Sequence, residues 1–180
     1  IAFLKAHISE DNYTRLIYYL EEYQRRGYDT IYNGLNKPRE GLGAGCTAFG
    51  LSFFEVAGIL HPSWQEAWTV DVRVPYRLIG GPITGQFVSL EEVFTARWWA
   101  DEDEPHKIFS IVDPYLIYDW IHDVWHKLMT ETKGDFSELR EEDSQAMPVL
   151  RVKAKGLVFD FSSSAVPDEP VFLPPSDTLR

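Results

Sequence analysis

The chain has 180 residues, of which 44% are hydrophobic, enough for the core of a single domain. Its formal net charge of −11 disfavours a nucleic-acid partner or an anionic membrane surface, because both present negative phosphates. No apolar run approaches the ~18 residues of a membrane-spanning helix, and a single cysteine excludes an intrachain disulfide.

The first part of the chain predicts a strand followed by a helix. Residues 1–8 alternate loosely, as in a strand, and Ser9 is then a suitable N-cap for a helix whose first turn is acidic. Apolar residues recur at helical spacing from Tyr13 to Tyr23, and Gly27 is placed to end the helix. Because the sequence opens directly on a strand, without Met or a signal peptide, we expect that upstream residues are missing from it.

A loop rich in Gly and Asn over residues 28–45 leads into a second predicted helix. This helix runs from about Cys46 to Ala57 and is ended by Gly58. His61, which follows it, is predicted to be a capping or loop residue.

The middle of the chain predicts a further strand and helix. The segment "WTVDVRV", residues 68–74, alternates as a strand does. Ser89 and Glu92 form a capping box, which predicts a helix that runs to about Trp99.

Another strand and the longest helix follow. The segment "HKIFSIV", residues 106–112, reads as a strand. Asp113 as N-cap and Pro114 as the first helical residue then predict a helix to about Met129.

The last part of the chain predicts a hairpin and a tail. In "VLRVKAKGLVFDF", residues 149–161, Lys155 and Gly156 are the predicted turn. Residues 163–180 are rich in proline and are predicted to be an extended tail outside a single domain over residues 1–162. The element pattern predicts an α+β fold with a mainly antiparallel sheet.

Cys46 is the candidate catalytic residue. A thiol attacks only as the thiolate, and the unpaired N–H groups of a helix N-terminus favour that anion. The same N–H groups can stabilise the oxyanion that forms when a thiolate attacks a carbonyl. Gly45 and Thr47, on either side of the thiol, are the candidate substrate-binding residues. The alternative is an inert core thiol, because Cys46 shares one helical face with Phe49 and Phe53.

Three segments resemble a known enzyme family. They are "HISEDNYTRLIYYLEEY" (7–23), "YDTIYNGLN" (28–36) and "GCTAFGLSFFEVAGIL" (45–60), and together they resemble the second half of the circularly permuted papain-like hydrolases of bacteria. The resemblance covers about residues 1–60. It departs from the family at Gly45, where Asn often precedes the cysteine.

The resemblance implies a papain-like kernel with elaborations after about residue 64, and no cofactor. It also implies a cysteine hydrolase or acyltransferase that acts on an amide or ester bond. The expected substrate is a peptide or lipid-like molecule of the bacterial cell envelope, which would place the protein in the periplasm or envelope. The alternative function is a non-catalytic binding or interaction protein on the same scaffold, with Cys46 packed inside.

A thiolate nucleophile needs an imidazole base within hydrogen-bond reach. His7 precedes Cys46, as the base does in the permuted families, although it stands at the end of its strand. His106 follows Cys46, as in unpermuted chains, and Asp113 is a candidate to orient it. The remaining alternatives are a histidine upstream of residue 1 or no catalysis, with both histidines as ordinary surface residues.

The pattern "IHDVWH" places His122 and His126 one helical turn apart, with Asp119 on the same side. The apolar residues of that helix define a buried face nearly opposite to these side chains. We therefore predict a solvated polar face and no metal site. The acidic run over residues 101–104 lacks the glycine and the spacing of a calcium loop.

Overall fold

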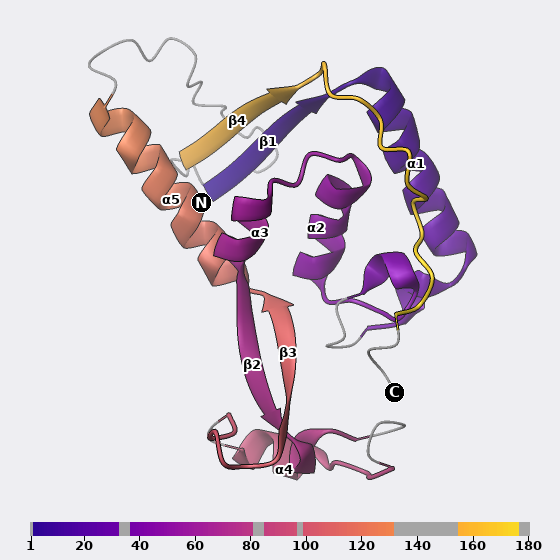
Figure 1. The fold of residues 1–180 in the computed structure, drawn as a ribbon, viewed down its shortest axis with the longest axis vertical. Coiled ribbons are helices and arrows are strands. Elements are labelled where there is room, and N and C mark those ends of the chain that lie inside the picture. The colour runs from indigo at the N-terminus through magenta and orange to yellow at the C-terminus, as the bar shows by residue number, and fades with distance from the viewer. Residues whose placement is uncertain (1, 33–36, 81–84, 97–98, 132–154, 177–180) are drawn as a thin grey trace, which may run out of the picture.

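The computed structural model describes residues 2–32, 37–80, 85–96, 99–131 and 155–176 (Figure 1). Within these ranges the chain forms a mixed α+β fold with five helices and two small two-stranded sheets. One sheet is parallel and the other is antiparallel, so the predicted α+β class is confirmed while the sheet is not mainly antiparallel. None of the described helices has the length and hydropathy needed to cross a bilayer.

The parallel sheet joins two distant segments of the chain. Strand β1 (Ala2–Ile8) pairs with β4 (Lys155–Phe161), as Figure 1 shows. The predicted turn at Lys155 and Gly156 is wrong, because both residues lie inside β4. Gly156 is buried against Phe3, and a Cβ at this position would lie 2.0 Å from Cζ of the Phe3 ring. Glycine is therefore explained by this close contact and not by a turn. Residues 149–154 of the predicted hairpin lie outside the described residues.

Helix α1 (Glu10–Arg25) begins and ends as the sequence predicts. The Ser9 hydroxyl accepts a hydrogen bond from the Asn12 N–H at 3.2 Å, which caps the start of the helix. Gly27 follows the helix with φ = 71°, a left-handed conformation that glycine adopts without strain. Tyr19 and Tyr23 form the buried side of α1 and pack against Val56.

Helix α2 (Cys46–Val56) lies beside α1, and helix α3 (Pro62–Trp68) follows it. The sequence analysis missed α3, although Pro62 is its first residue and His61 is its N-cap. The His61 ring nitrogen Nδ1 accepts from the Ser63 N–H at 3.2 Å, so the predicted capping role is confirmed. Trp64 and Trp68 are the buried residues of this helix.

The antiparallel sheet is a two-stranded ribbon that extends away from the α1–α2 pair (Figure 1). It consists of β2 (Thr69–Pro75) and β3 (His106–Val112), both close to their predicted ranges. Helix α4 (Leu90–Thr95) lies at the far end of the ribbon. Its capping box is confirmed, but it ends before the predicted Trp99; residues 97–98 lie outside the described part.

Helix α5 (Pro114–Glu131) packs against α3 and β4 and begins where predicted. The Asp113 carboxylate accepts from the Tyr115 N–H at 2.8 Å, which caps the helix.

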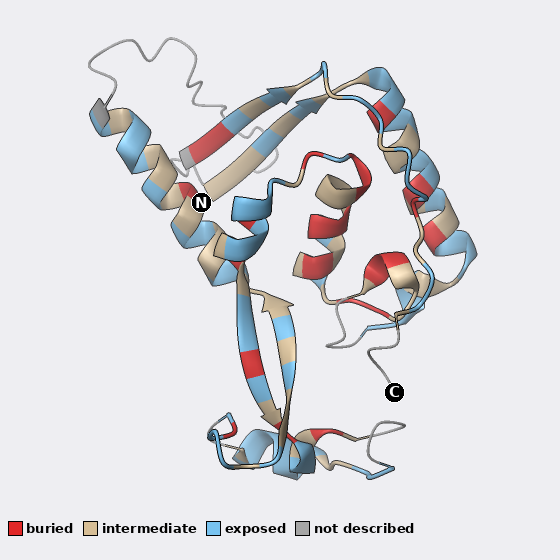
Figure 2. Cartoon of the chain, in the orientation of Figure 1, coloured by how far each residue is buried: buried red, intermediate tan, exposed pale blue. Residues whose placement is uncertain are grey.

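The predicted tail carries no helix or strand over residues 163–176 and passes along α1 toward α2 (Figure 1). Its remaining residues, 177–180, lie outside the described ranges. Figure 2 shows that buried residues concentrate on α1, α2 and the segment before α2, whereas α4 is exposed.

Candidate functional site

Cys46 is the first residue of α2 and is exposed to solvent. The N-cap residue, Gly45, has no side chain and therefore forms no capping hydrogen bond. The Cys46 Sγ atom lies 3.9 Å from the Thr47 hydroxyl, its one polar contact in the described part of the chain. The thiol thus stands at a helix N-terminus whose backbone donors are not covered by an N-cap side chain.

The side of α2 that packs into the core begins one turn after the thiol. Phe49 and Phe53 contact the buried ring of Tyr19, with ring centroids 6.4 Å and 5.5 Å away. Val56 is fully buried in the same cluster. These contacts fix the helix, while Cys46 stays outside the cluster. The interpretation of Cys46 as a buried core thiol is therefore wrong.

His7 lies near the end of β1 and is exposed, opposite Asp160 on β4. The Ser162 hydroxyl and N–H lower the pKa of the Asp160 carboxyl by hydrogen bonding, and the proximity of His7 adds to the effect. His7 therefore faces a carboxylate of the parallel sheet. Cys46 lies on a different element, at the opposite end of α2 from this sheet edge (Figure 1).

His106 is the first residue of β3, near α4 at the far end of the ribbon. Its Nδ1 donates to the Glu104 carbonyl at 2.7 Å. Asp113, which was predicted to orient it, follows the opposite end of β3 at a separation of roughly 20 Å along the strand. Among the described residues, no imidazole lies within hydrogen-bond distance of the Cys46 sulfur. The structure brings Gly45, Cys46 and Thr47 together but not the two histidines.

A pocket of about 310 Å³ opens on another side of α2. Its walls come from α2, from α3, from the ribbon, from the C-terminal tail and from the short 3-10 helix η2 (Pro38–Glu40). Residues that line it include Arg39, Leu51, Glu55, Gln65, Thr69 and Val112. We call it the Arg39–Glu55 pocket. No sequence pattern predicts this pocket, because its walls come from segments far apart in the chain.

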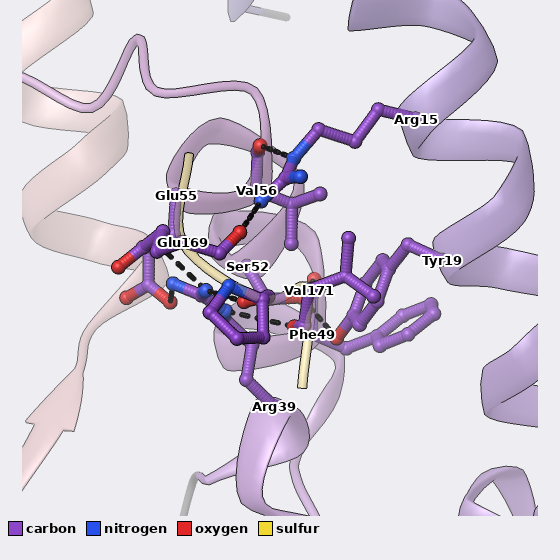
Figure 3. Close-up of polar contacts among 10 residues, drawn as sticks. Arg15, Tyr19, Arg39, Phe49, Ser52, Glu55, Val56, Glu169 and Val171 are labelled. Carbon is purple, nitrogen blue, oxygen red and sulfur yellow. Dashed lines mark hydrogen bonds and ion pairs between the residues drawn. The ribbon is translucent and has the colours of Figure 1, made fainter. Parts of the chain in front are cut away.

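Arg39 is the buried cation of this pocket, with its side chain 8% exposed (Figure 3). Its Nε donates to the Val171 carbonyl at 3.1 Å, and Nη2 donates to the Pro170 carbonyl at 2.8 Å. Nη2 also lies 2.8 Å from the Glu169 carboxylate. Arg39 therefore holds the tail against η2 and α2.

Glu55 is the less well-paired charge of the pocket. Its carboxylate lies 3.8 Å from Arg39 Nη1, which is an ion-pair distance and too long for a hydrogen bond. Burial raises the pKa of the Glu55 carboxyl, Arg39 partly offsets this, and the negative charge of Glu169 raises it further. A carboxyl with a perturbed pKa in a pocket is a feature of binding and catalytic sites.

The histidine pair of α5 stands on the side of the helix that the sequence predicts. His126 is exposed, and its Nε2 lies 3.2 Å from Nε2 of His122. In the described ranges, no group of three or more His, Cys, Asp or Glu side chains is placed to hold a metal ion.

A patch of exposed apolar side chains covers α4 and the residues before it. Phe87 is 92% exposed, Phe94 83% and Leu90 75%, and Val93 is half exposed. We call these four residues the α4 patch. Glu91 of the same helix is exposed and forms no ion pair with the rest of the described chain. An exposed apolar group of this kind is typical of an interaction surface.

No protein-family model, curated protein or solved structure matches this chain. The function is therefore inferred from the geometry of these sites.

Proposed function

We propose that the chain is a cysteine hydrolase or acyltransferase with Cys46 as its nucleophile. The observation that carries the proposal is an exposed thiol at the start of α2, where the N-cap residue has no side chain. The proposed substrate is an amide or ester in a peptide or lipid-like molecule of a bacterial envelope. The proposed scaffold is a papain-like kernel formed by β1, α1 and α2, and it needs no cofactor.

The proposed reaction begins when the Cys46 thiolate attacks the substrate carbonyl. The oxyanion that forms accepts a hydrogen bond from the Cys46 N–H at the helix N-terminus. The tetrahedral intermediate then expels the amine or alcohol, which takes up a proton, and an acyl-thioester remains on Cys46. Water releases the acid in a hydrolase, and a second amine or alcohol accepts the acyl group in a transferase. Gly45 leaves room for the substrate beside the sulfur.

The base remains a prediction at either His7 or His106, and because neither lies within hydrogen-bond distance of the Cys46 sulfur in the described chain, either would have to approach the thiol in order to act. Both lie on elements other than α2, and each has its own neighbour, the Asp160 carboxylate or the Glu104 carbonyl. Single substitutions to alanine separate the alternatives. The variant that lacks the base should lose at least about a hundredfold in the rate of acyl transfer, since general bases contribute that much. The other variant should keep the wild-type rate.

Acyl trapping tests the nucleophile directly. The protein is incubated with an activated ester, such as p-nitrophenyl acetate, and its intact mass and peptide map are recorded. We expect an acetyl group on Cys46 and no stable acetylation or catalysed turnover in Cys46→Ala. Equal ester hydrolysis by the wild type and Cys46→Ala would contradict the proposal. Labelling with iodoacetamide faster in the native than in the urea-unfolded chain would support a reactive thiol rather than a merely exposed one.

A second candidate function, an interaction protein, is favoured by the α4 patch. The unpaired carboxylate of Glu91 lies on the same helix as three of its apolar side chains, so we propose a partner protein with an apolar centre and a rim of Lys and Arg. A second copy of this chain is a poorer occupant, because two surfaces from a chain of net charge −11 repel.

This alternative is tested by titrating an amphipathic Leu-Lys helical peptide, with a Leu-Glu peptide as control. Binding should be specific to the Leu-Lys peptide, weaken as salt is added, and be lost in Leu90→Ser/Phe94→Ser. Binding that survives the double substitution would contradict the role of the patch. Cys46→Ala should leave this binding unchanged, so the two candidate functions fail independently.

A further inference from the structure

The Arg39–Glu55 pocket is a site separate from the thiol. Cys46 does not line it, although α2 contributes Ala48, Leu51 and Glu55 to its wall. These three residues lie at intervals of three and four, so one face of the helix is presented to the pocket. A volume of about 310 Å³ falls at the lower end of the range for small-molecule sites.

Most of the charges around the pocket are already paired. Lys37 lies 3.2 Å from Glu40, and the Glu40 carboxylate also accepts from the Ser176 N–H at 2.7 Å. Arg39 is shared between Glu169 at 2.8 Å and Glu55 at 3.8 Å. Lys37 and Arg39 are therefore paired with Glu40 and Glu169, and Glu55 is the lining charge with the weakest partner.

Glu55 is available to a further cationic partner. Its side chain is 33% exposed, and in the described chain it receives no hydrogen bond. Gln65 and Thr69 line the same pocket, and their side-chain oxygens also have no hydrogen-bond partner among the described residues. The pocket thus presents the Glu55 carboxylate and two uncharged polar side chains beside an apolar wall that includes Leu51 and Val112.

We propose that this pocket binds a primary ammonium group carried on a short aliphatic chain. The ammonium donates to the Glu55 carboxylate, with the Gln65 and Thr69 oxygens as further acceptors, and the aliphatic chain lies against Leu51 and Val112. A cation beside Glu55 offsets the cost of burying that carboxylate. This binding function goes beyond the proposed chemistry of Cys46 and does not depend on it.

The ammonium group can come from a free alkylamine or from a lysine side chain of a peptide. Binding of n-pentylamine, 1-pentanol and pentanoate to the full chain is measured by calorimetry and by chemical shifts of Glu55 and Leu51. We expect n-pentylamine to bind at least about tenfold more tightly than 1-pentanol, because a charged hydrogen bond contributes that much, and pentanoate not to bind. Equal affinity for the amine and the alcohol would overturn the proposal.

Variants locate the site. Glu55→Gln should weaken n-pentylamine at least about tenfold and leave 1-pentanol unchanged. The matched control is Glu66→Gln, an exposed carboxylate of α3 outside the pocket. Leu51→Phe narrows the pocket and should weaken both the amine and the alcohol. Unchanged amine binding in folded Glu55→Gln would overturn the proposal.

A final pair of measurements distinguishes the two sources of the ammonium group. N-acetyl-lysine amide that binds as tightly as n-pentylamine identifies a peptide lysine as the ligand. If n-pentylamine binds and N-acetyl-lysine amide does not, the ligand is a free amine. Failure of both ligands overturns the proposal. Cys46→Ala should bind n-pentylamine like the wild type, so loss of the hydrolase proposal would leave this one standing.

Discussion

At the scale of single residues, Tyr19 shows how burial and hydrogen bonding combine between α1 and α2. Its side chain has no exposed surface, and its hydroxyl lies 2.9 Å from that of Ser52. Ser52 donates to the Phe49 carbonyl at 2.6 Å, so Tyr19 is the donor in the pair of hydroxyls (Figure 3). Burial raises the pKa of Tyr19 to about 12, although the Ser52 hydrogen bond acts in the opposite direction.

Tyr19→Phe should lower the free energy of unfolding by about 1 kcal/mol at pH 7, the net contribution of one buried hydrogen bond. Because the folded pKa of Tyr19 is about 12 and the ordinary pKa of a tyrosine is 10.0, Tyr19 contributes stability below pH 10 that is lost as pH rises through 12. Urea unfolding at pH 7 and pH 10.5 measures both effects. Tyr18→Phe is the control, since Tyr18 is 51% exposed. An unchanged pH profile in Tyr19→Phe would contradict the assignment.

Glu55→Gln should raise the melting temperature at neutral pH. The pKa of Glu55 is raised by burial, so the folded chain binds this proton more tightly than the unfolded chain. The resulting destabilisation is absent below the ordinary pKa of a glutamate and appears as pH rises through the folded value. The gain in Glu55→Gln should therefore vanish by about pH 4. Calorimetry at pH 7 and at about pH 4 measures the melting temperatures of the wild type, of Glu55→Gln and of the control Glu66→Gln. A lower melting temperature of Glu55→Gln than of the wild type at pH 7 would refute the prediction.

At the scale of elements, the tail is fixed by side chains from two other segments, η2 and α1 with its C-cap. Arg39 of η2 binds the carbonyls of residues 170 and 171, and the N–H of Leu173 donates to the Arg39 carbonyl at 2.9 Å. Arg15 of α1 donates to the Val56 carbonyl at 2.8 Å and also to that of Glu169 (Figure 3). Phe172 lies under the Arg26 guanidinium, 4.3 Å from ring centroid to Cζ. The proline-rich segment is thus held in place by hydrogen bonds that no local pattern encodes.

Arg39→Met should destabilise the chain by about 3 kcal/mol, because it leaves the carbonyls of residues 170 and 171 without their donor and the Glu55 carboxylate without its ion-pair partner. The tail should also become the first site of cleavage in limited proteolysis. Arg25→Met, which breaks the exposed pair with Glu22, should cost less than about 1 kcal/mol. Equal proteolysis of Arg39→Met and the wild type would show that the tail is held by other contacts.

The elements that were predicted well carry their signals locally. Ser9, Ser89 and Asp113 cap the helices that follow them, and each cap is within three residues of its partner. Two errors are local, the missed α3 and the predicted end of α4, and the others concern contacts between distant segments. Gly156 was read as a turn because nothing in its neighbourhood reveals that Phe3 lies against it. Local signals also place Cys46 at the start of a helix. They do not reveal the Arg39–Glu55 pocket, because its walls come from segments far apart in the chain.

At the scale of the whole molecule, two separate aromatic clusters form the core. One surrounds Tyr19 between α1, α2 and the tail. The other centres on Trp64, which stacks on Trp68 at 5.5 Å and contacts Trp120 at 5.5 Å and Phe159 at 4.9 Å. This second cluster joins α3, α5 and the parallel sheet, and it contains three of the six tryptophans of the chain.

Trp64→Ala should cost about 3–5 kcal/mol, the range for truncation of a large buried aromatic residue. Because α3, α5 and β4 all contact this ring, the near-ultraviolet circular dichroism should weaken well beyond the loss of one chromophore. Trp99→Ala removes a side chain that is 61% exposed and should change stability by less than about 0.5 kcal/mol. Similar losses in the two variants would show that Trp64 does not organise the cluster.

The pairing of β1 with β4 also constrains how the chain is made. The two strands are about 150 residues apart in sequence, so a ribosome must translate almost all of the intervening chain before β1 can find its partner. Until then the nascent β1 exposes an unpaired edge to other polypeptides in the cell. A stop codon anywhere before residue 155 would leave that edge permanently open, and the shortened product should aggregate.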